Sequence, residues 1–289
     1  MNNKFVIVAE SSCDLDHQYC IDNNVQITAF NFSLEDKSYR HYFDEREMTN
    51  KEFYDLIEKG GVFKTTLVNV EQHTETLETF LKDGYDVLAI SLSSALSGTF
   101  NCLRMACELL EETYPDRKII AIDSLAASMG QGLLVIESVK QKALGKSLSE
   151  TADFVNKNIM HTNQNFWIPD LQYLARGGRF GAGAPVPPFK PILVISKSGK
   201  LEMYKKFDNQ AEAIAGLVNE LSVGHFNPKM EVAVAHANNK EAAELLIKAI
   251  NKTYPDLKIR LTAMGPLVGS HVGPGTLGLF FFGDERSVN

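Results

Sequence analysis

The sequence predicts an α/β protein of two domains, the first with a mainly parallel sheet flanked by helices and the second mixed α/β. Short apolar runs alternate with amphipathic segments through the first half, which is typical of parallel strands joined by helices. The chain has 289 residues, of which 44% are hydrophobic, and is therefore long enough for two cores. We place the domains at 1–163 and 164–289.

The first domain is predicted from three buried strands and four helices. Strands are expected at the apolar runs 4–9, 85–91 and 118–122. Capping-box pairs predict helix starts at Thr49 with Glu52, at Asn69 with Gln72 and at Ser147 with Glu150. A further amphipathic helix is expected at 97–113.

The second domain is predicted from a hairpin and two helix–strand units. The hairpin pairs 191–196 with 200–207 around a turn that contains Gly199. The units are 210–222 with 230–235, and 240–252 with 258–263. A last strand-like run, LGLFFF, follows at 277–282.

Composition excludes several classes of function. The net charge of −7 argues against nucleic-acid binding, because phosphate backbones favour basic surfaces. The sequence has no apolar run of membrane-spanning length and no signal-peptide pattern, so we expect a cytoplasmic protein without stable membrane insertion. The four cysteines lack metal-site spacing, and we expect them to be reduced, with no metal or cofactor bound.

The C-terminal segment GPLVGSHVGPGTLGLFF (265–281) concentrates five glycines around His271. It contains GxGxxG, but a strand-like run follows instead of a helix, which excludes the dinucleotide-binding fingerprint. Glycines permit backbone N–H groups to approach an anion, and His271 adds a side-chain donor. A tight structural turn is the alternative interpretation of this segment.

Hydroxyl-bearing segments elsewhere favour the anion site. SSALSGT (93–99) leads from a strand into a helix, the place where α/β sheets bind anions. Thr65 and Thr66 lie in a predicted loop, and ESSCD (10–14) follows the first strand. We expect these segments to converge with His271 on one crevice.

The whole set of motifs resembles the DegV family, bacterial proteins that bind a fatty acid between two α/β domains. The matching segments, in chain order, are ESSCDL, SLSSALSGTF, DSLAASMGQGLLV, YLARGGR, KPIL and GPLVGSHVGPGTLGLFF. The likeness extends over nearly the whole chain. It implies the family's fold, with DSLAASMGQGLLV as a central helix.

The resemblance also implies site residues and partners. A long-chain fatty acid or similar lipid would be held by its carboxylate at Thr65, Thr66, Ser93, Ser94 and His271. Lining or partner contacts are implied for Arg176, Arg179, Gly269, Ser270 and Gly273. The protein would be a non-catalytic monomer that presents the carboxylate to a fatty acid kinase.

Two segments depart from the family pattern. The K-T-S-x-P element is KTTLVN here (64–69), which keeps a hydroxyl but lacks the proline. Relatives carry an apolar helix of about fourteen residues after RGGR, whereas this chain has FGAGAPVPPF (180–189), whose prolines and glycines prevent a regular helix. We therefore predict a different chain-length selectivity, or a ligand other than a straight fatty acid.

Two other functions remain open at the level of sequence. A hydrolase or phosphotransferase would pair Ser94 or Ser270 with His271, with Asp14 or Asp123 as the orienting acid. A binding or sensor module for another carboxylate, a phosphate or an isoprenoid would use the same site with a different tail pocket.

Overall fold

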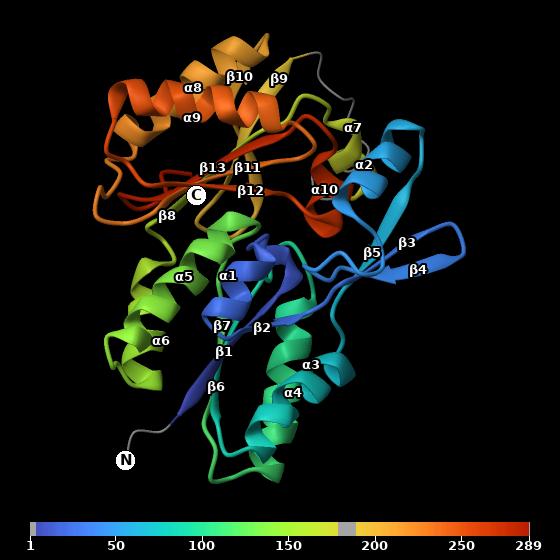
Figure 1. Cartoon of the computed structure of the whole chain (residues 1–289), viewed down its shortest axis with the longest axis vertical. Helices are drawn as coiled ribbons and strands as arrows, with labels where there is room; N and C mark the ends of the chain where they lie inside the picture. The colour runs from blue at the N-terminus through green and yellow to red at the C-terminus, as the bar shows by residue number, and fades with distance from the viewer. Residues whose placement is uncertain (1–3, 179–188, 289) are drawn as a thin grey trace.

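The computed structural model describes residues 4–178 and 189–288, and it confirms the predicted α/β fold with a parallel first sheet and a mixed second sheet (Figure 1). The first sheet has the order β2-β1-β6-β7, with every neighbouring pair parallel. Its strands are β1 (Phe5–Glu10), β2 (Val25–Thr28), β6 (Asp86–Ser91) and β7 (Ile119–Asp123). The helices of this half are α1 (His17–Asp22), α3 (Val70–Lys82), α4 (Thr99–Thr113), α5 (Met129–Ala143) and α6 (Leu148–Asn158).

The second sheet has the order β10-β9-β8-β13-β11-β12, and only its β11–β12 pair is parallel. Its strands are β8 (Thr162–Trp167), β9 (Lys190–Ile195), β10 (Leu201–Phe207), β11 (Val232–His236), β12 (Ile259–Ala263) and β13 (Leu277–Phe282). The helices are α7 (Gln172–Arg176), α8 (Gln210–Val223), α9 (Lys240–Thr253) and α10 (Pro266–Val272). The predicted hairpin and both helix–strand units are confirmed.

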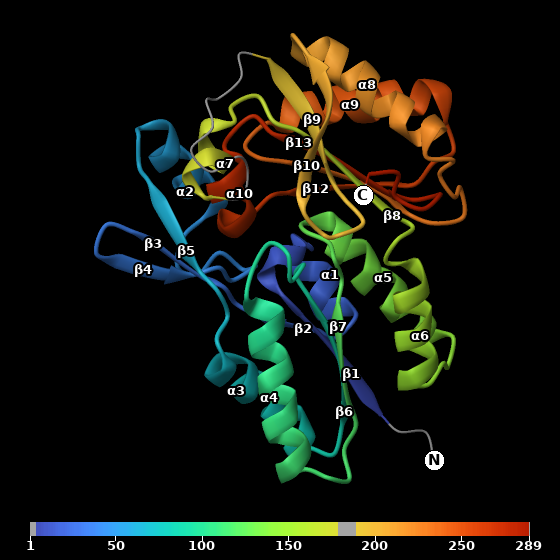
Figure 2. The ribbon, with the colours of Figure 1, turned by 180° about the vertical axis from the view of Figure 1, so that it is seen from behind.

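A small antiparallel sheet with the order β4-β3-β5 extends the first half toward the second. Its strands are β3 (Asn31–Leu34), β4 (Lys37–Arg40) and β5 (Phe63–Thr66), and α2 (Asn50–Glu58) leads into β5. The expected loop at Thr65 and Thr66 is therefore wrong, because both residues lie in an edge strand. In both views, β5 and α2 lie beside α10 and α7 of the second half (Figures 1 and 2).

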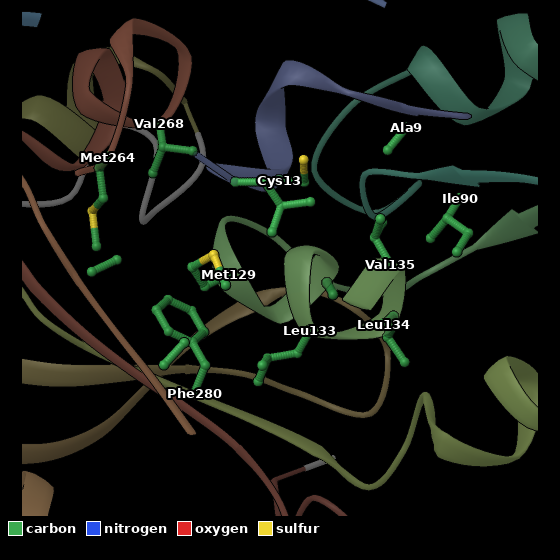
Figure 3. Packing of buried hydrophobic residues seen from close by; sticks show 14 of the residues in the cluster. Ala9, Cys13, Ile90, Met129, Leu133, Leu134, Val135, Met264, Val268 and Phe280 are labelled. Carbon is green, nitrogen blue, oxygen red and sulfur yellow. The ribbon is translucent and has the colours of Figure 1, made fainter. Parts of the chain in front are cut away.

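The described chain forms five layers, with α5 at the centre. Helices α3 and α4 cover one face of the first sheet, and α8 and α9 cover the outer face of the second. Helix α5 contacts strands of both sheets. Figure 3 shows Met129 of α5 beside Phe280 of β13, while Val135 on the same helix is turned toward Ile90 of β6. One hydrophobic cluster consequently runs from the first sheet to the second.

The three predicted capping boxes are confirmed. The side chains of Thr49, Asn69 and Ser147 each accept a hydrogen bond from the backbone N–H of the residue three positions later. The side chain of that later residue accepts a hydrogen bond from the backbone N–H of the capping residue. These caps satisfy N–H groups that a helix start otherwise leaves without partners. Local chemistry therefore determines where α2, α3 and α6 begin.

Two sequence-based predictions concern the middle of the chain. Strand β8 begins at Thr162 and belongs to the second sheet, while the predicted division of domains after residue 163 remains a prediction. Arg179 and the Gly/Pro segment 180–189, apart from Phe189, lie outside the described residues.

Candidate functional site

An apolar cavity lies between the two sheets, beside α10. Its volume is about 80 Å³. The apolar side chains that line it come from both halves of the chain: Phe30, Leu67, Leu92, Leu96, Ala127, Phe166, Leu174, Ile195, Leu201, Leu267, Val268 and Val272. Three polar residues, Thr65, Ser97 and His271, complete the lining. This arrangement suits a ligand with an apolar body and one polar end.

Thr65 and His271 form a polar pair at the cavity, although they are distant in sequence. The Thr65 Oγ1 and His271 Nε2 atoms lie 2.9 Å apart, and both residues are half-buried. Side chains alternate along a strand, so Thr66 faces away from Thr65 and is exposed. Of the two threonines that the sequence predicts as ligands, Thr65 therefore borders the cavity and Thr66 does not line it.

The glycine-rich segment around His271 is a short helix, α10, and not the predicted loop of free N–H groups. The N–H groups of Gly269 and Gly273 donate to the carbonyls of Gly265 and Gly269, at 2.8 and 2.9 Å. A Cβ at Gly269 would lie 2.5 Å from the Tyr54 hydroxyl oxygen. Gly273 ends the helix at φ +74°, in contact with Tyr173. These glycines allow close packing of α10, which places His271 on the cavity.

In the serine-rich turn after β6, the cavity lining includes Ser97 and not Ser93 or Ser94, the two serines that the resemblance implies as ligands. The buried Ser93 hydroxyl donates to the Gly199 carbonyl at 2.8 Å and thereby joins the turn to the β9–β10 hairpin. Ser94 is exposed, and its backbone N–H donates to Asp123 Oδ1 at 3.1 Å. Ser97 lines the cavity instead. The spacing of the motif could not separate these serines, because the path of the turn decides which one faces the cavity.

A second hollow lies on the outer side of the Thr65–His271 pair. It has a volume of about 510 Å³ and shares both residues with the cavity. Arg176 and Tyr173 both line this hollow, and the Arg176 guanidinium lies over the Tyr173 ring, 4.6 Å from the ring centre. Ser270 also lines this hollow, and its hydroxyl donates to the Pro266 carbonyl at 2.6 Å. The polar pair is thus accessible from both sides.

Comparison with known proteins identifies the family. A family profile described as "Uncharacterised protein, DegV family" matches residues 4–284. This chain belongs to the DegV family. A DegV domain-containing protein of Clostridium perfringens is 34% identical over 288 residues, which cover 98% of this chain and 99% of that protein.

Solved DegV structures share the whole fold. A fatty-acid-binding DegV family protein of Streptococcus agalactiae superposes with a TM-score of 0.86 at 20% identity, covering 98% of this chain and 100% of its own. A stearic-acid-binding protein of Eubacterium ventriosum superposes with a TM-score of 0.84 at 23% identity, covering 96% and 98%. The two-sheet architecture is therefore that of solved proteins.

Two buried carboxyl groups lie behind the cavity of this DegV protein. Burial raises the pKa of Glu10 and of Asp14 to about 7, against hydrogen bonds that lower it. Asp123, the other acid considered as a partner for His271, accepts N–H groups of Ser94 and Leu125 at 3.1 Å. Asp14 bonds to Ser128 and Gly265, so Asp14 and Asp123 both have partners other than the His271 imidazole.

Among the described residues of this DegV protein, no group of three His, Cys, Asp or Glu side chains is placed to hold a metal ion. None of the helices in residues 4–178 and 189–288 is long and apolar enough to cross a membrane. All four cysteines are free thiols.

Proposed function

We propose that this protein binds a long-chain fatty acid, with the acyl chain in the apolar cavity and the carboxylate at the Thr65–His271 pair. One observation carries the proposal: a polar pair, 2.9 Å apart, borders a cavity whose other lining is almost entirely apolar. Ser97 provides a further hydroxyl at the same cavity. The similar solved structures of a stearic-acid-binding protein and of a fatty-acid-binding DegV family protein support this assignment.

The energetics of binding a fatty acid fit a site that has an apolar cavity for the chain and a polar pair for the carboxylate. A desolvated carboxylate needs charge-assisted hydrogen bonds, and a hydroxyl and an imidazole supply them. Burial contributes about 0.8 kcal/mol per methylene, so some fifteen methylenes give a gross gain of roughly 12 kcal/mol, reduced by ordering costs. The tail would therefore supply most of the affinity, and Thr65 and His271 would orient the head group.

The cavity must enlarge to accept such a ligand. Ligand pockets measure roughly 300–1,000 Å³, whereas this cavity has a volume of about 80 Å³. The surrounding side chains would have to move apart by rotamer changes or by small shifts of the walls. Because the sequence of 180–189 departs from the family pattern, we retain the prediction of an unusual chain-length selectivity.

We further propose that the protein acts as a carrier that presents the carboxylate to a fatty acid kinase, without cofactor or catalysis of its own. Thr65 and His271 border both the cavity and the outer hollow, which would leave the carboxylate within reach of a partner. The proposed setting is a cytoplasmic monomer, in agreement with the free thiols. A kinase assay with ATP and hydroxylamine should trap acyl hydroxamate only when the loaded carrier is present.

The hydrolase alternative has less support. The Ser270 hydroxyl is bonded to the backbone of its own helix, and Ser94 lies outside the cavity lining. Asp14 and Asp123 bond to groups other than His271. An acyl-ester hydrolase activity that disappears in Ser94→Ala would restore this alternative.

The carrier proposal is tested by native mass spectrometry of freshly purified protein, followed by identification of the extracted lipid. We expect a retained acid of a few hundred daltons. An isoprenoid or a phosphorylated compound would instead support a sensor module. A straight saturated C16 or C18 acid alone would contradict the predicted change in selectivity.

Adjacent threonines provide a matched test of the head-group site. Thr65→Val removes the hydroxyl beside His271, and we expect about tenfold weaker binding, equal to roughly 1.4 kcal/mol. Thr66→Val changes the exposed neighbour in the same strand and should leave affinity within about twofold. Equal affinities of the two variants, measured by titration with a fluorescent fatty acid, would exclude Thr65 as a head-group ligand.

A further inference from the structure

The segment Glu10–Asp14 lies at the carboxyl end of the central strand β1. None of its residues lines the cavity. Its five residues are all buried. From its sequence, this segment is predicted to lie at the anion site. The structure instead connects its side chains to the backbone of three separate cavity walls.

Asp14 holds the start of α10. Its Oδ1 atom accepts the Gly265 N–H at 3.0 Å, and its Oδ2 atom accepts the Ser128 hydroxyl at 2.6 Å. Gly265 directly precedes α10, and Ser128 directly precedes α5. One carboxyl therefore connects the start of the seven-residue helix α10 to the start of the central helix α5.

Glu10 and Ser11 hold two further walls. The Glu10 Oε2 atom accepts the N–H of Leu92, a cavity residue of the serine-rich turn, at 3.0 Å. The Ser11 Oγ atom accepts the N–H of Phe30, a cavity residue between β2 and β3, at 3.0 Å. Gln131 of α5 donates to the same Glu10 oxygen at 2.9 Å and fixes its position.

We propose that Glu10, Ser11 and Asp14 are positioning residues that set the walls of the acyl cavity, and that Asp14, through α10, holds His271 beside Thr65. His271 lies six positions after Gly265, in the seven-residue helix that Gly265 directly precedes, so a shift at Gly265 would change the position of the imidazole. The acyl-binding part of this inference rests on the proposed function. The effect on the imidazole does not require a ligand.

The test compares three variants in the full-length protein. Asp14→Ala removes the acceptor for Gly265, Asp14→Asn keeps a carbonyl oxygen at that position, and Asp16→Ala removes a nearby exposed carboxyl. Asp16 caps α1 and pairs with Arg260, so its loss reduces stability without touching α10. Nitrogen and carbon resonances of the His271 imidazole are recorded by NMR without ligand, and affinity is measured with a fluorescent fatty acid.

We expect Asp14→Ala to shift the His271 resonances and to weaken fatty-acid binding at least tenfold. Asp14→Asn should restore most of the affinity, and Asp16→Ala should match the wild type in both measurements despite a lower melting temperature. Unchanged His271 resonances in folded Asp14→Ala, or equal losses of affinity in Asp14→Ala and Asp16→Ala, would overturn the proposal.

A second variant covers the case in which Asp14→Ala does not fold. Ser11→Ala removes only the acceptor for the Phe30 N–H and should weaken acyl binding about threefold. Wild-type affinity in Ser11→Ala would then overturn the inference that these residues set the cavity walls. Absence of fatty-acid binding by the wild type would instead refute the proposed function, and the ligand-free resonances would still decide the role of Asp14.

Discussion

Asp14 bonds to the residue that precedes α5 and to the residue that precedes α10, yet the surroundings of these two helices differ. Helix α5 contacts strands of both large sheets, whereas α10 contacts α7, α2 and the small sheet. The first ten residues of α5 are buried, and its side chains contact both sheets (Figure 3). Helix α10 is seven residues long and borders the cavity with Leu267, Val268, His271 and Val272.

The difference shows how a protein can combine a rigid packed region with a cavity that could accept a ligand. The fully packed α5 region fixes the two sheets, because filled cores resist displacement. The α10 region leaves unfilled volume beside a half-buried imidazole, and its walls are held by hydrogen bonds from Asp14, Glu10 and Ser11. We expect stability to depend mainly on α5 and ligand binding mainly on α10.

The largest effect should come from truncating leucines in the two regions. Leu133→Ala in α5 removes a fully buried side chain and should reduce the free energy of unfolding by about 4 kcal/mol, whereas Leu267→Ala should cost about 2 kcal/mol because its side chain already borders a cavity. Urea denaturation measures both. Equal losses would show that the α10 region is packed as tightly as α5.

The buried carboxyls predict a pH effect on stability. The pKa of Glu10 rises from 4.5 to about 7 on folding, so the native state binds more protons than the unfolded state between these values and loses stability as pH rises through that window. Each such group contributes at most roughly 3 kcal/mol. Glu10→Gln keeps an acceptor for Leu92 but does not titrate.

The measurement for this prediction is the difference between wild type and Glu10→Gln in urea denaturation at pH 5 and pH 8. Buried His41 and His73 act in the opposite direction, because burial lowers their pKa values to about 3 and about 4. They are common to both proteins and cancel in the difference. An identical change with pH in the two proteins would contradict the assignment to Glu10.

Filling the cavity should separate binding from folding. Ala127 lines the cavity just before α5, and Ala127→Leu would occupy part of its 80 Å³. We expect at least tenfold weaker fatty-acid binding, equal to about 1.4 kcal/mol, with stability changed by less than about 1 kcal/mol. Unchanged affinity would mean that the acyl chain lies elsewhere.

The smallest effect concerns the serine-rich turn between the two regions. Ser93→Ala removes the hydrogen bond to Gly199 and should reduce stability by about 1 kcal/mol. Ser94→Ala should stay within about 0.5 kcal/mol, because that side chain is exposed. Thermal unfolding of the two variants checks the order, and a larger loss in Ser94→Ala would reverse the assignment.

Part of the candidate site was predictable from the sequence. The motifs predict Thr65 and His271 as ligand candidates, and the structure brings these two residues together. Ser97 was not singled out, although it lies in the same motif as Ser93 and Ser94. Its position on the cavity depends on the docking of the turn against the β9–β10 hairpin, which no spacing within the motif records.

The sequence by itself determined the α/β class, the capped starts of α2, α3 and α6, and the hairpin around Gly199, because propensity, capping and hydrophobic period act within a few residues. Only the tertiary structure decided the helical state of α10, the strand at Thr65, and the role of Glu10–Asp14 as a support behind the cavity. Those features depend on contacts between segments that are separate in the sequence, such as Phe32 with Thr65 in the β3–β5 pair, Thr65 with His271, and Asp14 with Gly265. Packing between distant segments, rather than local preference, determines which polar groups face a ligand and which hold the walls.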